Sequence, residues 1–166
     1  MEFISSDTNV WIDFGCIDRL GLPFLLPYSY IMYYEQIERE LLSVNREELT
    51  KSGLQAVDIT IDEFFLAEEY GAKYLALSKW DRIALAIAKN RNIKLLTGDM
   101  PLRKAAIKEK VQVVGTIGIV DELYNRGLVD KQEYIYCLEA LLEKNGRMVR
   151  LPSEELKRRL AEARGE

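Results

Sequence analysis

Short apolar runs alternate along the chain with longer stretches in which apolar residues recur at helical spacing. The short runs have the length of strands, and strands are predicted at 3–6, 56–60, 93–97 and 111–114. The longer stretches fit amphipathic helices, and helices are predicted at 8–20, 28–43, 45–52, 61–70, 78–91 and 101–110. Gly21 and Gly71 lie where two of these helices are expected to end. Because strands separated by helices usually pair in parallel, the pattern predicts an α/β three-layer sandwich with a central, mostly parallel sheet over residues 1–115.

The pattern changes after residue 115, where only helical spacing remains. Helices are predicted at 117–126 and 131–144, and a charged helix is predicted to begin at Ser153. Residues 116–166 are therefore expected to form a helical C-terminal extension packed on the same domain. Its expected role is an additional layer for core, homodimer or partner contact rather than chemistry.

Composition narrows the class of protein. The chain has 166 residues, of which 48% are hydrophobic, which is enough to bury the core of one compact domain and excludes intrinsic disorder. A net charge of -4 argues against a generally basic nucleic-acid-binding surface and confines any such contact to a local basic rim. Two cysteines are too few for a disulfide scaffold, and no apolar run approaches the length of a membrane span. With no signal peptide visible, we expect a cytoplasmic protein without a membrane segment.

The chain contains no histidine, and this removes several chemistries. A Ser-His-Asp triad and a histidine general base are both excluded. Hydrolytic or phosphoryl chemistry would therefore have to rest on carboxylates and a hard metal ion.

Three aspartates stand where such a site could form. Asp7 follows the strand at 3–6, Asp99 follows the strand at 93–97, and Asp81 lies in the first turn of the helix at 78–91. Parallel strands share the edge at which they end, and open α/β folds bind their ligands at that edge. Each aspartate also has a purely structural interpretation as a helix cap, but capping and metal ligation are compatible because one carboxylate has several lone pairs.

The combination of acids favours a function over capping alone. Carboxylates that are held together repel one another and raise their pKa values. Two like charges 4 Å apart cost about 4 kcal/mol at an effective dielectric constant of about 20. A divalent cation reverses the sign of this interaction, and Mg²⁺ prefers carboxylate and water oxygens.

Three segments, in this order, resemble the acidic motifs of the PIN domain: ISSDTNVWID at 4–13, LSKWDRIALAIA at 77–88 and KLLTGDMPLR at 94–103. The resemblance covers roughly residues 3–114. It implies a PIN-like fold and a ribonuclease that depends on Mg²⁺ or Mn²⁺, similar to the VapC-type toxins of prokaryotic toxin–antitoxin pairs.

The resemblance also implies which residues form the site. Asp7, Asp81 and Asp99 would hold the metal ion, and Glu35 would be the fourth catalytic acid, which the family carries on its second helix. Glu38 competes with Glu35, because it lies within the apolar stripe of the predicted helix, where a carboxylate needs a partner.

Basic residues near these acids are candidates for binding the substrate. Lys79 and Arg82 flank Asp81, and Arg103 follows Asp99, so these three side chains could steer an RNA backbone towards the acids. A solvated helix position is an equally good interpretation of Arg82. The resemblance further implies RNA as substrate, a small antitoxin protein as partner, and a homodimer.

Two other classes of protein compete with the ribonuclease. One is a non-catalytic PIN-like protein that acts through partner or RNA binding. The other is a phosphate-accepting receiver-like domain, which expects a lysine after the last strand, where this chain has Gly115 and Thr116. An aspartyl phosphatase would need a second aspartate two residues after Asp7, where Asn9 stands.

Overall fold

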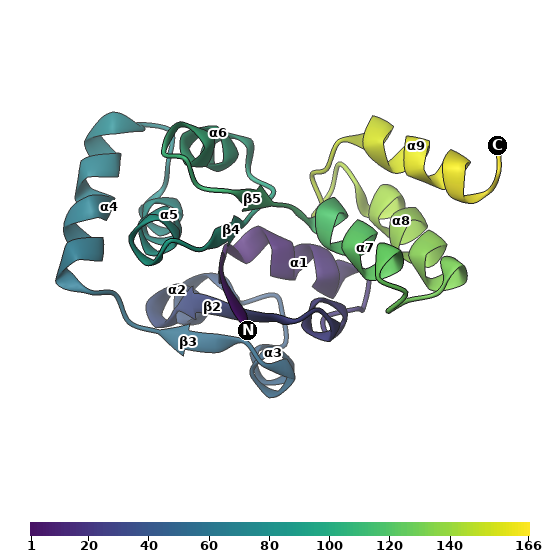
Figure 1. The fold of residues 1–166 in the computed structure, drawn as a ribbon, viewed down its shortest axis with the longest axis horizontal. Coiled ribbons are helices and arrows are strands. Elements are labelled where there is room, and N and C mark those ends of the chain that lie inside the picture. The colour runs from purple at the N-terminus through teal and green to yellow at the C-terminus, as the bar shows by residue number, and fades with distance from the viewer.

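A five-stranded parallel sheet forms the centre of the molecule in a computed structural model that describes all residues from 1 to 166 (Figure 1). Its strands are β1 (Glu2–Ser6), β2 (Tyr28–Tyr33), β3 (Gln55–Val57), β4 (Lys94–Leu96) and β5 (Val113–Val114). They lie in the order β3-β2-β1-β4-β5, and each neighbouring pair is parallel. The predicted α/β class with a parallel sheet is confirmed, and β1 lies at the centre of the sheet.

Helices connect the strands and then continue alone to the C-terminus. The connecting helices are α1 (Thr8–Cys16), a 3-10 turn η1 (Leu22–Leu25), α2 (Tyr34–Glu40), α3 (Arg46–Ser52), α4 (Ile61–Lys73), α5 (Lys79–Arg91) and α6 (Met100–Lys108). The C-terminal helices are α7 (Thr116–Asn125), α8 (Lys131–Lys144) and α9 (Ser153–Ala163). None of these helices is both long and apolar enough to cross a membrane.

Two hydrophobic cores cover the two faces of the sheet. One lies under α4, α5 and α6, and the other lies under α1 and the C-terminal helices (Figure 1). Trp11 of α1 is fully buried in the second core, and its indole N–H donates to Ser6 Oγ at 3.1 Å. Leu138 of α8 and Leu156 of α9 are fully buried in the same core. Because each fully buried side chain of this kind stabilises by roughly 1.5–3 kcal/mol, the C-terminal helices are integral to this layer.

The helix predicted at 28–43 is wrong over its first half. Residues Tyr28–Tyr33 form β2, and the helix is only Tyr34–Glu40. All six residues of β2 are buried, because the strand is paired on both sides and covered on both faces. Such a strand is apolar throughout and shows no alternation, so its pattern resembles that of a buried helix.

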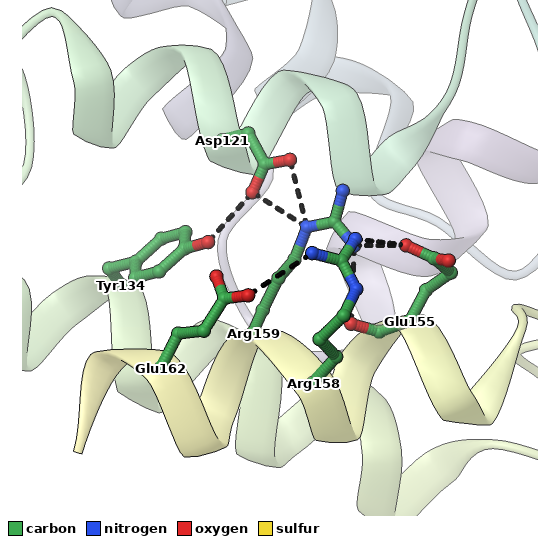
Figure 2. Close-up of polar contacts among 6 residues, drawn as sticks. All are labelled: Asp121, Tyr134, Glu155, Arg158, Arg159 and Glu162. Atoms are coloured by element: carbon green, nitrogen blue, oxygen red, sulfur yellow. Dashed lines mark hydrogen bonds and ion pairs between the residues drawn. The ribbon is translucent and has the colours of Figure 1, made fainter. Parts of the chain in front are cut away.

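Polar contacts centred on Asp121 of α7 join this helix to α9 and to α8 (Figure 2). Arg159 Nε lies 2.8 Å from Asp121 Oδ2 of α7, and Arg159 Nη1 lies 2.6 Å from Glu155 Oε2 on its own helix. Tyr134 of α8 donates its hydroxyl to Asp121 Oδ1 at 2.7 Å. The Arg159 guanidinium is thus neutralised by two carboxylates, and its contact with Asp121 joins the middle of α9 to α7.

Candidate active site

Asp7 directly follows the central strand and is almost completely buried, with 4% of its surface exposed. Its backbone N–H donates to Leu96 O of β4 at 2.9 Å, which fixes it between the ends of β1 and β4. Oδ1 accepts from Thr8 N at 2.9 Å and from Gln36 Nε2 at 3.2 Å. Oδ2 accepts from Thr97 Oγ1 at 2.9 Å. The carboxylate therefore caps α1, as the structural interpretation expects, and is also held by side chains from two other segments.

Burial raises the pKa of Asp7, the nearby charge of Asp81 adds to this increase, and the net pKa is about 7. The hydrogen bonds from Thr8 and Thr97 act in the opposite direction, and the charge of Glu40 adds a smaller increase. The carboxylate is thus poorly compensated when it is ionised, because hydrogen bonds offset only part of its desolvation. A cation placed beside Asp7 would relieve this cost.

Asp81 and Asp99 both cap helices, and each keeps one oxygen without a hydrogen bond inside the chain. Asp81 Oδ2 accepts from Ser78 N at 3.0 Å in the capping box of α5. Asp99 Oδ2 accepts from Leu102 N at 3.1 Å at the start of α6. The structure therefore shows Asp81 and Asp99 as helix caps. The second oxygen of each carboxylate could still bind a further ligand.

The three aspartates interact electrostatically. Burial raises the pKa of Asp81, and the charges of Asp99 and Glu40 raise it too, against hydrogen bonds from Ser78 that lower it. Asp81 also raises the pKa of Asp7. The ends of β1 and β4 and the start of α5 therefore bring their acids to one edge of the sheet, as expected for parallel strands.

Glu40, at the end of α2, is the acid that sequence reasoning missed. Its Oε1 accepts from Thr8 Oγ1 at 2.8 Å and from Gln36 Nε2 at 3.1 Å. Gln36 is fully buried, and the same Nε2 donates to Asp7 Oδ1 and to Thr8 Oγ1. Glu40 therefore shares one hydrogen-bond donor, Gln36 Nε2, with Asp7, and its charge raises the pKa of both Asp7 and Asp81.

The two glutamates proposed from the sequence lie elsewhere on α2. Glu35 is half-buried, and Oε1 accepts from the hydroxyl of Tyr34 at 3.3 Å. Glu38 is exposed and has no hydrogen bond or ion pair. Neither shares a hydrogen bond with the aspartates. The site role of Glu35 stays a prediction, and the geometry gives Glu40 the stronger claim.

The donors at this edge fit a hard divalent cation in their chemistry. Carboxylate oxygens of Asp7, Asp81, Asp99 and Glu40 are the ligands that Mg²⁺ and Mn²⁺ prefer. No three acids of the chain, however, are close enough together to hold one ion as their side chains stand. As the side chains stand, one oxygen of Asp81 and one of Asp99 accept from their own helices, and only the other oxygen of each is free for a further ligand.

The predicted substrate-binding residues differ in their surroundings. Lys79 lies over the ring of Trp80, with Nζ 4.9 Å from its centroid. The Arg82 guanidinium packs against Gly71 of α4, where any side chain would collide with it. Arg103 is half-buried, and Nη1 donates to the carbonyl of Thr97 at 3.3 Å beside the acids. Of the three, Arg103 has the most direct structural link to the site.

Comparison with known proteins agrees with this geometry. A family model described as a PIN domain matches residues 3–164, a range that includes the C-terminal helices. Comparisons with curated proteins and with solved structures give no match. PIN domains are generally nucleases and generally use divalent metal ions. Since the match spans almost the whole chain, the protein belongs to the PIN-domain family.

Proposed function

We propose that the protein is an endoribonuclease that depends on Mg²⁺ or Mn²⁺ and hydrolyses RNA phosphodiester bonds at the edge where β1 and β4 end. The observation that carries the proposal is the placement of Asp7. This buried carboxylate has its pKa raised to about 7 by burial and by Asp81, while Glu40 accepts from the same Gln36 Nε2 donor. Such a cluster is costly unless a cation balances it, and functional sites are where these costs are found.

Each acid has a defined part in this proposal. Asp7, Asp81 and Asp99 would hold the ion, which supplies a Lewis acid for phosphoryl transfer. Glu40 replaces Glu35 as the acid that positions the attacking water. In-line attack by this water breaks the bond from phosphorus to the 3′ oxygen and leaves a 5′-phosphate and a 3′-hydroxyl. Gln36 and Thr97 keep the Asp7 carboxylate in one orientation.

Basic side chains around the acids would bind the RNA backbone. Arg103 extends from α6 beside the loop that carries Asp99, and Lys79 and Arg82 stand on the first turn of α5. Guanidinium and ammonium groups bind phosphate through charge-assisted hydrogen bonds. These three residues remain our candidates for substrate binding, with Arg103 first.

The resemblance to VapC-type toxins extends the proposal to the cell. We propose that the protein acts as a toxin in the cytoplasm and that a small antitoxin protein inhibits it. We also propose that it forms a homodimer. Light scattering on the purified chain tests the dimer, and co-purification with the product of an adjacent small gene tests the antitoxin.

One observation favours the alternative of a non-catalytic PIN-like protein. The acids are too widely spaced to hold one ion together without side-chain movement. A protein of this kind would act through partner or RNA contact and would cleave no RNA at saturating Mg²⁺ or Mn²⁺. A metal titration of RNA cleavage therefore separates the two functions.

Replacing Asp81 tests the proposed function directly. We expect Asp81→Ala to lower metal-dependent cleavage of a labelled RNA by about 10³-fold, because it removes a metal ligand. Asp81→Asn keeps an acceptor for Ser78 N and should lose activity with the fold intact. The matched control is Asp62→Ala, which removes an exposed acid from the first turn of α4. Cleavage by both Asp81 variants at the parent rate would refute the assignment.

A further inference from the structure

A groove of about 1120 Å³ lies next to the acid cluster, and of its lining residues the mechanism above uses only Asp99 and Arg103. One wall is the loop and helix start at 98–103, which carries Asp99. The opposite wall comes from residues 145–152, the connection between α8 and α9, here called the C-terminal strap. The start of α7 lies between them, and Figure 1 shows the strap turning beside it. The groove therefore joins the nuclease edge to the C-terminal helices.

The C-terminal strap has a fixed conformation. Asn145 Nδ2 donates to Leu151 O at 2.9 Å, and Leu151 N donates back to Asn145 Oδ1 at 2.8 Å, which closes the segment into a loop. Inside it, Gly146 N donates to Val149 O at 2.9 Å, and the Val149 side chain is fully buried. A Cβ built on Gly98 would lie 3.8 Å from Leu151 Cδ2, an ordinary van der Waals distance. The strap therefore lies beside the loop that carries Asp99.

Two of the three arginines in the groove have no carboxylate partner. Arg159 is neutralised by Asp121 and Glu155, as Figure 2 shows. Arg103 donates only to a backbone carbonyl, and Arg150 of the strap is exposed and forms no ion pair. The groove thus presents two guanidinium groups that no carboxylate neutralises, one on each wall.

The acids that line the groove do not cancel these two charges. Asp99 belongs to the acid cluster, and Glu155 is paired with Arg159. Asp13 is buried at the floor, where its Oδ2 accepts from Thr116 Oγ1 at 2.6 Å, and burial raises the pKa of this carboxyl to about 7. Each acid is therefore either part of the cluster or already occupied.

We propose that this groove binds the sugar–phosphate backbone of single-stranded RNA on one side of the cleaved bond, with Arg150 and Arg103 contacting phosphates from opposite walls. The proposal rests on the proposed function, because the groove opens beside its acids. The planar guanidinium group binds phosphate with two parallel hydrogen bonds. The C-terminal extension would then supply part of the substrate-binding surface as well as core.

The lining of the groove indicates which part of the RNA it takes. None of its lining residues is Phe, Tyr or Trp, so it offers no platform on which bases could stack. Its volume exceeds the range of about 300–1,000 Å³ that is typical of small-molecule pockets. The absence of aromatic residues and the size of the groove both fit an RNA backbone that is bound through its phosphate charges, with little dependence on base sequence.

Paired substitutions in the strap test the proposal by binding rather than by cleavage. Arg150→Gln removes the charge in the groove, and Arg147→Gln removes an exposed, unpaired arginine from the same strap that does not line the groove. Fluorescence anisotropy with a labelled, mixed-sequence single-stranded RNA in EDTA gives the Kd at several salt concentrations. We expect Arg150→Gln to raise the Kd about 5- to 10-fold and to reduce the salt slope by about 0.7, which corresponds to one lost phosphate contact. Arg147→Gln should change the Kd less than about 2-fold.

The outcomes separate this proposal from the function on which it rests. Equal Kd values and salt slopes for parent and Arg150→Gln overturn the groove as an RNA site, whether or not the parent cleaves RNA. The groove is also overturned if Arg147→Gln weakens binding as much as Arg150→Gln, or if the parent binds no RNA. RNA binding that depends on Arg150, without cleavage at any metal concentration, supports the groove and refutes the nuclease.

Discussion

Replacement of Glu40 by glutamine is expected to lower metal-dependent RNA cleavage about 10²-fold, the upper end of the effect of residues that support metal ligands. The change removes the charge that Glu40 places beside Asp7 and Asp81. Glutamine keeps an oxygen that can accept from Thr8 Oγ1 and Gln36 Nε2, so α2 should stay in place. The measurement is the initial rate of cleavage of a labelled RNA at saturating Mg²⁺, with thermal melting as the check on folding.

The other glutamates of α2 are the matched controls. Glu35→Gln and Glu38→Gln make the same chemical change on the same helix, but neither side chain contacts the acid cluster. We expect both variants to cleave within about threefold of the parent, as is usual for surface changes away from a site. A large loss in Glu35→Gln together with full activity in Glu40→Gln would return the catalytic role to Glu35.

Replacement of Asp7 by asparagine is expected to have two opposite effects, loss of cleavage and gain of stability without metal. Cleavage should fall by about 10³-fold, because the proposed central metal ligand is lost. In EDTA, however, the variant should unfold at a temperature several degrees higher, since it no longer buries a charge beside Asp81 and Glu40. Added Mg²⁺ should raise the melting temperature of the parent but not of the variant.

Asp58→Asn is the control for this pair of effects. Asp58 also follows a strand of the same sheet, and Oδ1 accepts from the next backbone N–H, that of Ile59, at 2.8 Å. It is exposed, so its replacement should change neither cleavage nor melting appreciably. If Asp7→Asn were destabilised in EDTA by more than this control, the strained acid cluster would not exist as described.

The sequence is sufficient to predict the three aspartates because their positions follow from local rules. Asp7 and Asp99 come after strands whose predicted ends agree with the structure to within a residue, and Asp81 follows the N-cap Ser78. Parallel strands must end at the same edge, so the meeting of these acids needs no knowledge of side-chain packing. Because the three carboxylates repel one another, a cation is expected to bind between them.

Glu40 cannot be found in this way because its position depends on where β2 ends. The apolar run from Tyr28 predicts one long helix, and the periodicity of that helix places Glu38 within its apolar stripe and Glu35 at the edge of that stripe. Because residues 28–33 form a buried strand, α2 begins only at Tyr34. Its last residue, Glu40, then lies within hydrogen-bond distance of Thr8. A central strand that is buried on both faces gives no periodic signal that would reveal this.

The groove is equally beyond prediction, because it is a product of tertiary packing. Arg150 and Arg159 are both basic residues in a charged C-terminal region, and nothing in their spacing separates them. In the structure one is neutralised by two carboxylates and the other is free, because α9 packs against Asp121. The proposed substrate contact would add a role to the helical layer that the sequence predicts for the extension.

The most direct test of the central claim is the position of Mn²⁺ in crystals of the parent protein, determined from anomalous scattering. We predict a peak at the edge where β1 and β4 end, with oxygens of at least two of Asp7, Asp81 and Asp99 in direct coordination after their side chains rotate towards the ion. An anomalous map at saturating Mn²⁺ with no peak at these aspartates, or with peaks only elsewhere on the surface, would contradict the account.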